Sequence, residues 1–429
     1  MRQQQLKLIL FSVLFALLFL PFLQQQFSVF TFKPLTGEFI PAEKQNITMA
    51  GWLQGDFQKA YDKNYEENLG FRNFLIRFYN QVDFSFFNTM HAEVVAGKKG
   101  YLFQESYLNS FTGNDFIGEE KIKEEVRKIK FVKDRLKEKG ISLVLAIAPS
   151  KVRFYPEYIP SYYLNRQTIA TNYYTYKRML QDEQVPFMDF IDYFSKLKDT
   201  TRYLLYPKQG IHWSQYGMYV VADSLLKKIR TDEGIMLNNL SFDSIEFTDQ
   251  LRSTDYDLGD LSNVLFEMKH DKMPYPVLHF ENDPAKPRPN VLVIGDSYYW
   301  NIYYAEIPKY IFSRANFWYY NHEVYADTLP GKQIVDQANF MNEVERQRIV
   351  IVLETEINLN KFGFGFFDLV YERYQNPDNT VAAYEKMIRN NPEWLEAVKQ
   401  KAADRKIPLE QMIKSDAEWM AEQDRAKTH

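Results

Sequence analysis

The chain has 429 residues, long enough for two or three domains or for one large α/β domain with appendages. Its 52 Lys and Arg residues against 56 Asp and Glu residues give a net charge of −4, which argues against nucleic-acid binding because phosphate affinity needs clustered cations. The 45% hydrophobic content excludes a mostly disordered chain, and zero cysteines exclude thiol catalysis, cysteine-ligated zinc and disulfides.

The N-terminus carries an apolar segment. Residues 1–7 contain Arg2 and Lys7, whereas residues 8–23 carry no charge. As a helix this segment spans about 24 Å, close to the ~30 Å core of a bilayer. A cleaved signal peptide and an uncleaved signal anchor are both possible, and we favour the anchor because no Ala-x-Ala cleavage pattern follows. The positive residues before the span place everything after it outside the cytoplasm.

Composition divides the chain into five predicted regions. We expect a cytoplasmic tail at 1–7, a transmembrane signal anchor at 8–23, a tether at 24–50, a main domain at 51–375 and a helical appendage at 376–429. The appendage has the pattern of two or three charged helices, for which a role in packing or assembly is expected.

Helical and strand-like segments alternate through the main domain. Residues 51–90 have helical spacing, with Phe71, Phe74, Leu75 and Phe78 on one stripe. Further helices are expected at 119–139, 171–183, 214–230 and 332–346, and strands at 141–149, 185–190, 290–296 and 348–354. Continuous apolar runs after helices are typical of parallel strands buried on both faces. The alternation predicts a doubly wound α/β sheet.

Gly295-Asp296-Ser297 directly follows one of these predicted strands. In open α/β sheets, ligands bind at the carboxyl ends of the strands. A serine at such a strand-to-helix turn can expose its hydroxyl and place backbone N–H groups near a developing oxyanion. We therefore predict Ser297 as a nucleophile, with Gly295 allowing the tight backbone and Asp296 bracing the turn. The alternative is a helix cap, which Ser and Asp commonly form.

His212 is the candidate general base. It lies after the strand-like segment 202–207 and ahead of an apolar helix at 217–228, again where α/β active sites form. A neutral histidine can accept the serine proton and return it to a leaving group. Taken alone, His212 is equally compatible with a structural role, and its pairing with Ser297 supports catalysis.

Weaker candidates for oxyanion or substrate contacts are Gly295, Asp296, Tyr303 and Asn321. The many aromatic residues at 298–320 suit stacking on sugar rings, although such residues more often form core. The sequence has no His-x-x-x-His spacing and no phosphate-binding glycine loop, so we expect neither a metal nor a cofactor.

Together the motifs resemble the SGNH-hydrolase-like proteins of the alginate O-acetylation type, the AlgX/AlgJ group. The resemblance covers about residues 51–360 and depends on the order of short motifs along the chain. These motifs are Gly70-Phe71-Arg72, Gly97-Lys98-Lys99-Gly100-Tyr101-Leu102-Phe103, Ala148-Pro149-Ser150-Lys151, Tyr155-Pro156, Ile159-Pro160, His212-Trp213 and Gly295-Asp296-Ser297. The resemblance implies a flavodoxin-like, SGNH-hydrolase-like doubly wound parallel sheet.

It also implies a function. A member of this group would be an O-acyltransferase, acetyl being the expected acyl group, held in the bacterial inner membrane by one span with its catalytic domain in the periplasm. The implied partners are an exported polysaccharide and a membrane-bound O-acyltransferase that donates the acyl group. Two alternatives remain: a carbohydrate esterase of the same fold, and a non-catalytic glycan-binding or scaffold subunit of an export complex.

One position departs from the family pattern, which usually reads Asp-x-His-Trp with the Asp orienting the His. Gly210 occupies the Asp position, and no carboxylate is adjacent to it. Three interpretations stay open: an acid from elsewhere, with Glu354 or Glu356 as candidates; a Ser–His dyad; or a binder without activity. If the position is simply empty, Gly210→Asp is expected to raise the rate.

Overall fold

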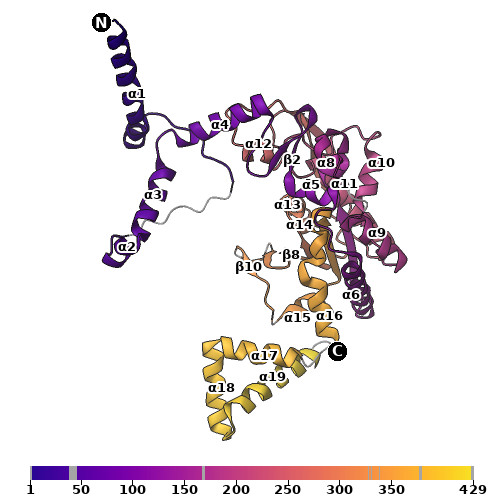
Figure 1. Cartoon of the computed structure of the whole chain (residues 1–429). Helices are drawn as coiled ribbons and strands as arrows, with labels where there is room; N and C mark the ends of the chain where they lie inside the picture. The colour runs from indigo at the N-terminus through magenta and orange to yellow at the C-terminus, as the bar shows by residue number, and fades with distance from the viewer. Residues whose placement is uncertain are drawn as a thin grey trace.

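The computed structural model describes residues 2–37, 46–166, 170–326, 328–329, 331–337, 339–375 and 379–426. Figure 1 shows helix α1 (Arg2–Phe27) projecting from one end of an α/β body, and helices α17 (Asn379–Asn390), α18 (Pro392–Arg405) and α19 (Leu409–Ala426) grouped at the other end. The body contains the sheet and its covering helices.

Among the described residues, seven strands form one sheet in the order β10-β9-β8-β7-β11-β3-β4. Their bounds are β3 Ser142–Ala148, β4 Met188–Asp189, β7 Asn290–Gly295, β8 Arg314–Tyr319, β9 Glu323–Ala326, β10 Gln333–Ile334 and β11 Ile349–Thr355. The strands from β8 to β4 run parallel, and β9 and β10 extend the sheet antiparallel at one edge. The expected parallel sheet is therefore confirmed, with an antiparallel addition.

Helices cover both faces of this sheet. Alternate residues of β3, β7 and β11 contribute to two separate cores, as the two-residue period of a strand requires. One core is closed by α5 (Glu105–Thr112), α7 (Lys151–Phe154), α10 (Phe190–Leu197), α11 (Gln215–Asp232), α13 (Tyr299–Tyr304) and α14 (Ile307–Ile311). The other is closed by α6 (Glu119–Glu138), α9 (Asn172–Asp182), α15 (Phe340–Glu345) and α16 (Phe366–Gln375).

The remaining elements lie around this body. Two antiparallel hairpins pair β1 (Val94–Ala96) with β2 (Leu102–Gln104) and β5 (Leu240–Thr248) with β6 (Met273–Phe280). The remaining α-helices are α2 (Met49–Gln54), α3 (Asp56–Asn68), α4 (Arg72–Phe87), α8 (Ser161–Leu164) and α12 (Asp257–Leu261). The 3₁₀ segments are η1 (Lys98–Gly100), η2 (Pro156–Tyr158) and η3 (Glu356–Gly365).

Several predicted elements differ from the structure. Segment 202–207 is a loop, the strand predicted at 185–190 is only the short β4, and the helix predicted at 332–346 is β10 followed by the short α15. The β5–β6 hairpin was not predicted. Its residues are half-buried or exposed along most of their length, so no long apolar run marks it.

Helix α1 is longer than the predicted span at both ends and includes the first residues of the predicted tether. The helical segment 3–27 is long and apolar enough to cross a membrane. None of the residues in its most apolar stretch is buried against the rest of the protein. Residues 38–45 of the tether lie outside the described residues. So do residues 376–378, with which the predicted appendage begins. The division into regions stays a prediction.

Candidate active site

The structure brings Ser297 and His212 into contact although they are 85 residues apart. Ser297 lies in the turn after β7, and His212 lies in the loop just ahead of α11. The Nε2 atom of His212 is 3.0 Å from the Ser297 hydroxyl oxygen. This is the distance that proton transfer between a nucleophile and its base requires.

Asp257, the first residue of α12, lies on the other side of the His212 ring. Its Oδ2 is 3.1 Å from His212 Nδ1, and its Oδ1 accepts hydrogen bonds from the backbone N–H groups of Ile211 and Leu258 at 2.8 and 2.7 Å. A carboxylate can only accept, so the ring hydrogen lies on Nδ1 and the Nε2 lone pair faces Ser297. The three side chains form a Ser–His–Asp arrangement suited to acyl transfer.

Sequence reasoning missed Asp257. It lies 45 residues after His212, in a segment with no apolar periodicity to place it at the sheet edge. The local signal is the acid-rich sequence Asp255-Tyr256-Asp257-Leu258, whose second Asp starts a short helix.

Gly210 lies against the backbone that precedes Asp257. A Cβ added at Gly210 would come within 2.4 Å of the Thr254 carbonyl oxygen and 3.0 Å of the Asp255 carbonyl carbon. The position is therefore filled by backbone rather than empty. The expectation that Gly210→Asp raises the rate loses its basis, since the acid already reaches His212 from α12.

A buried lysine holds the histidine loop. Lys151, only 3% exposed, donates hydrogen bonds from Nζ to the carbonyl oxygens of Lys208, at 2.9 Å, and of Gly210. Burial lowers the pKa of Lys151 to about 7, and the nearby Asp257 carboxylate opposes that shift. The loop is also tied to the β1–β2 hairpin, because Leu102 donates its backbone N–H to the Lys208 carbonyl at 2.9 Å.

The ring of Tyr298 packs against the ring of His212. The two ring centroids are 4.8 Å apart, and the Tyr298 hydroxyl donates to the Ile211 carbonyl at 2.9 Å. Trp213, which is fully buried, packs edge-on against Tyr298. Burial raises the pKa of Tyr298 well above its ordinary value, so this hydroxyl remains a hydrogen-bond donor.

Asp296 is fully buried and braces the serine turn. One of its oxygens accepts from the Tyr298 backbone N–H at 3.0 Å. The other accepts from the Thr355 backbone N–H and hydroxyl, both at 2.7 Å, and from the Asn358 side chain at 2.8 Å. These contacts join the ends of β7 and β11 under Ser297. The oxyanion or substrate role predicted for Asp296 and Gly295 stays a prediction.

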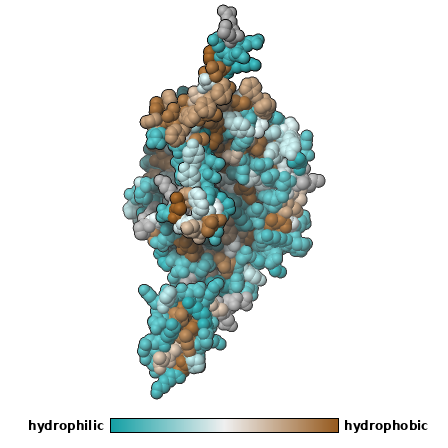
Figure 2. Space-filling view, turned by 60° about the vertical axis from the view of Figure 1, so that its left-hand side comes forward, coloured by the Kyte–Doolittle hydropathy of each residue, from teal (hydrophilic) through white to brown (hydrophobic). Residues whose placement is uncertain are grey.

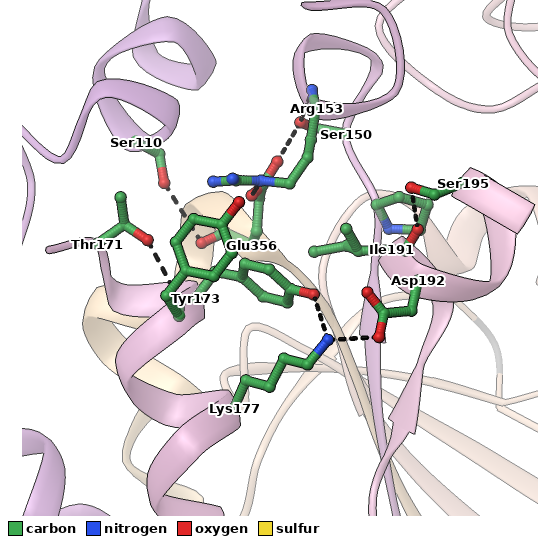
Figure 3. Close-up of polar contacts among 12 residues, drawn as sticks. Ser110, Ser150, Arg153, Thr171, Tyr173, Lys177, Ile191, Asp192, Ser195 and Glu356 are labelled. Carbon is green, nitrogen blue, oxygen red and sulfur yellow. Dashed lines mark hydrogen bonds and ion pairs between the residues drawn. The ribbon is translucent and has the colours of Figure 1, made fainter. Parts of the chain in front are cut away.

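Neither predicted glutamate is the hydrogen-bond partner of His212, because Asp257 takes that place. Glu356 accepts hydrogen bonds from the Ser150 hydroxyl and from Arg153 Nε, as the close-up in Figure 3 shows. Glu354 is fully buried and accepts the Gly363 backbone N–H at 2.6 Å. Burial, with the nearby Asp296 charge adding to it, raises the pKa of Glu354 well above its ordinary value.

Tyr303 and Asn321 lie in aromatic surroundings beside the site. Tyr303 packs against Trp300 and Phe317, with ring centroids 5.5 and 6.0 Å apart. Asn321 is buried, and its side-chain nitrogen donates to the Phe364 carbonyl at 3.2 Å. The substrate roles predicted for both residues remain untested.

A family model described as an SGNH hydrolase-like domain, acetyltransferase AlgX, matches residues 94–305. This stretch contains Lys151, His212, Asp257 and Ser297. Residues 94–305 are an SGNH hydrolase-like domain of the AlgX/AlgJ type. The family resemblance inferred from the motifs is thereby confirmed.

Curated relatives of this chain are described as probable alginate O-acetylases AlgJ. The protein from Pseudomonas fluorescens is 25% identical over 179 residues, covering 41% of this chain and 43% of the relative. The protein from Pseudomonas putida is 26% identical over 217 residues, covering 50% and 52%. The matched region thus spans about two fifths to one half of these relatives.

Two solved structures are also similar to parts of the chain. The O-acetyltransferase domain of Pseudomonas putida AlgJ matches at 17% identity with a TM-score of 0.42, covering 65% of this chain and 98% of that one. Bacillus cereus PatB1 matches at 13% identity with a TM-score of 0.40, covering 64% and 99%.

Proposed function

We propose that this protein is a membrane-anchored, extracytoplasmic O-acyltransferase that transfers an acyl group, acetyl by preference, to an exported polysaccharide. The observation that carries the proposal is the continuous contact from Asp257 through His212 to Ser297, at the carboxyl edge of a parallel sheet. The AlgJ relatives, described as probable alginate O-acetylases, support an alginate-like polysaccharide as acceptor.

The geometry supports a two-step reaction through an acyl-serine. Ser297 Oγ attacks the donor carbonyl while His212 Nε2 takes the hydroxyl proton, and Asp257 stabilises the imidazolium that forms. The imidazolium then returns the proton to the leaving group, which departs and leaves acyl-Ser297. In the second step a sugar hydroxyl gives its proton to His212 and attacks the acyl carbonyl. His212 passes that proton to Ser297 Oγ as the acyl–oxygen bond breaks, which releases free Ser297 and the acylated sugar.

Helix α1 supports placement of this chemistry at a membrane. Its apolar side chains are exposed along the whole span, and two positive residues precede its uncharged stretch. We infer that the helix lies in the bacterial inner membrane with the domain in the periplasm. A membrane-bound O-acyltransferase is the proposed source of acyl groups, because an extracytoplasmic enzyme needs a donor that crosses the membrane.

The test offers the full-length protein in detergent an activated acetyl ester with and without an uronic-acid oligosaccharide. A transferase should acetylate the oligosaccharide and release less free acetate, and both activities should disappear in Ser297→Ala. Acetate released at the same rate with no acetylated sugar would indicate the esterase alternative. Neither product from a folded protein would indicate the scaffold alternative.

A further inference from the structure

Two polar residues of helix α4, Arg77 and Asn80, are turned into the protein. Arg77 and Asn80 are each only 8% exposed. Arg77 donates to the carbonyls of Val264, at 3.1 Å, and Pro34, at 2.7 Å. Asn80 donates to the carbonyls of Ser262 and Asn263 at 3.1 and 3.2 Å. The inward face of α4 thus binds the body through these hydrogen bonds and through Phe84, which packs against a small apolar cluster that includes Val94 and Leu258.

The opposite face of α4 is apolar and exposed. We call this the outer stripe; its most exposed members are Leu75 (49%), Phe78 (51%), Tyr79 (58%) and Phe86 (77%). Their spacing places them together on the side away from Arg77 and Asn80. A helix at a water-exposed surface normally has the reverse polarity, so the stripe fits an apolar environment outside the protein.

The outer stripe is continuous with the end of the anchor. Gly70, just before α4, lies so close to α1 that an added Cβ would be 2.1 Å from the Pro21 carbonyl oxygen. Ring contacts then lead from Phe32 to Phe74 at 5.7 Å and from Phe74 to Phe78 at 6.2 Å. Figure 2 shows hydrophobic surface gathered at the end of the molecule from which the N-terminal helix projects.

We propose that α4 lies along the membrane surface, with the outer stripe in the interfacial layer of the lipid bilayer. This proposal rests on the proposed membrane anchor. Lipid is the occupant that the stripe fits, because it joins the end of the spanning helix and is rich in aromatic rings, which prefer the headgroup level. The stripe itself contains no charged side chain.

This placement orients the active site relative to the bilayer. The inward face of α4 binds residues 262–264, which follow α12, and α12 begins with Asp257. Lys33 of the segment after α1 also pairs with Asp260 at 2.7 Å, and Asn263 exchanges two hydrogen bonds with the Thr36 backbone, both 2.8 Å. Helix α4 and the segment after α1 therefore hold the part of the chain that begins with Asp257.

The absence of native cysteines allows a direct test by single-cysteine labelling. We would place an environment-sensitive fluorophore at Phe78→Cys, Phe86→Cys, Leu14→Cys or Tyr174→Cys in the full chain. Each variant would be reconstituted in vesicles of phosphatidylethanolamine and phosphatidylglycerol. Quenching would be measured with nitroxides attached either to the lipid headgroup or deep in the acyl chain. Tyr174 is the matched control, because it lies on α9 of the body, outside the stripe, and its side chain is as exposed as that of Leu75, at 49%.

Labels at Phe78 and Phe86 should lose fluorescence with headgroup nitroxides more than with deep ones, whereas Tyr174 should lose none. The label at Leu14 should be quenched by the deep nitroxide. Quenching at Leu14 together with Tyr174-like behaviour at Phe78 and Phe86 would overturn the inference while leaving the anchor intact. Failure at Leu14 would instead reject the anchor itself, and the inference with it.

Discussion

The carboxylate of Asp257 orients the ring of His212 and also holds the loop that carries this histidine. Its Oδ2 contacts His212 Nδ1, and its Oδ1 accepts the Ile211 N–H. Asp257→Asn can keep a hydrogen bond to the ring but favours the wrong tautomer. We therefore expect a loss of about 10³- to 10⁴-fold in the rate of p-nitrophenyl acetate hydrolysis, with the fold retained.

Glu354→Gln is the matched control for that substitution. The pKa of Glu354 is raised by burial, so the neutral amide resembles the protonated acid, and its oxygen can still accept the Gly363 N–H. The rate of ester hydrolysis by Glu354→Gln should stay within about threefold of the wild-type rate. If Glu354 were the acid that orients His212, the variant would instead lose the rate that general-base assistance contributes. A large loss in Glu354→Gln with normal activity in Asp257→Asn would reverse the assignment.

Gly210 gives a second prediction at the residue scale. Any side chain there meets the Thr254 carbonyl oxygen at 2.4 Å, and backbone cannot move as cheaply as a flexible side chain. Gly210→Asp should lower the midpoint of thermal unfolding and lower activity, and Gly210→Ala should do the same more mildly. A variant that is both stable and faster than wild type would show that the site has room.

At the scale of elements, α7 controls the histidine loop through Lys151. The folded state lowers the pKa of Lys151 to about 7, below the ordinary 10.5. Between these values the unfolded state binds more protons, so the contribution of Lys151 to stability rises as pH increases from about 7 to 10.5. Denaturant unfolding of wild type and Lys151→Met should show a difference that grows in favour of wild type over this window.

The same substitution also removes two hydrogen bonds to loop carbonyls, those of Lys208 and Gly210. The Gly210 carbonyl would lose the hydrogen bond from Lys151, at a cost of about 1–3 kcal/mol for an unpaired buried group, whereas the Lys208 carbonyl keeps the backbone N–H of Leu102. Lys151→Met should therefore be destabilised even at pH 7 and should hydrolyse the ester more slowly. A pH-independent difference between the two proteins would contradict a lysine whose pKa is lowered by burial.

The elements that sequence patterns predicted well are those buried on both faces. β3, β7 and β11 carry continuous apolar runs and lie close to their predicted bounds. Ser297 follows β7, one of these strands. His212 precedes α11 as predicted, although the segment 202–207 before it is a loop and not the predicted strand. Asp257 was missed because α12 is five residues long and reaches His212 only through tertiary packing. No local periodicity encodes that contact.

At the scale of the whole molecule, the chain joins an apolar helix, an α/β body and a helical appendage with its own small core. If α1 is an uncleaved anchor, the full-length chain should sediment with membranes, resist extraction at alkaline pH and retain residues 2–27. The checks are fractionation and mass mapping of the N-terminus. A mature protein that begins after about residue 24 would contradict the anchor.

Peptide mass mapping after brief incubation of the full-length protein with an activated acetyl ester tests directly whether Ser297 is the nucleophile. We expect one added acetyl group on the peptide that contains Ser297. The adduct should be absent in Ser297→Ala and should form much more slowly in Asp257→Asn. An acetyl group found only elsewhere, together with an unchanged rate in Ser297→Ala, would contradict the assignment of Ser297 as the nucleophile.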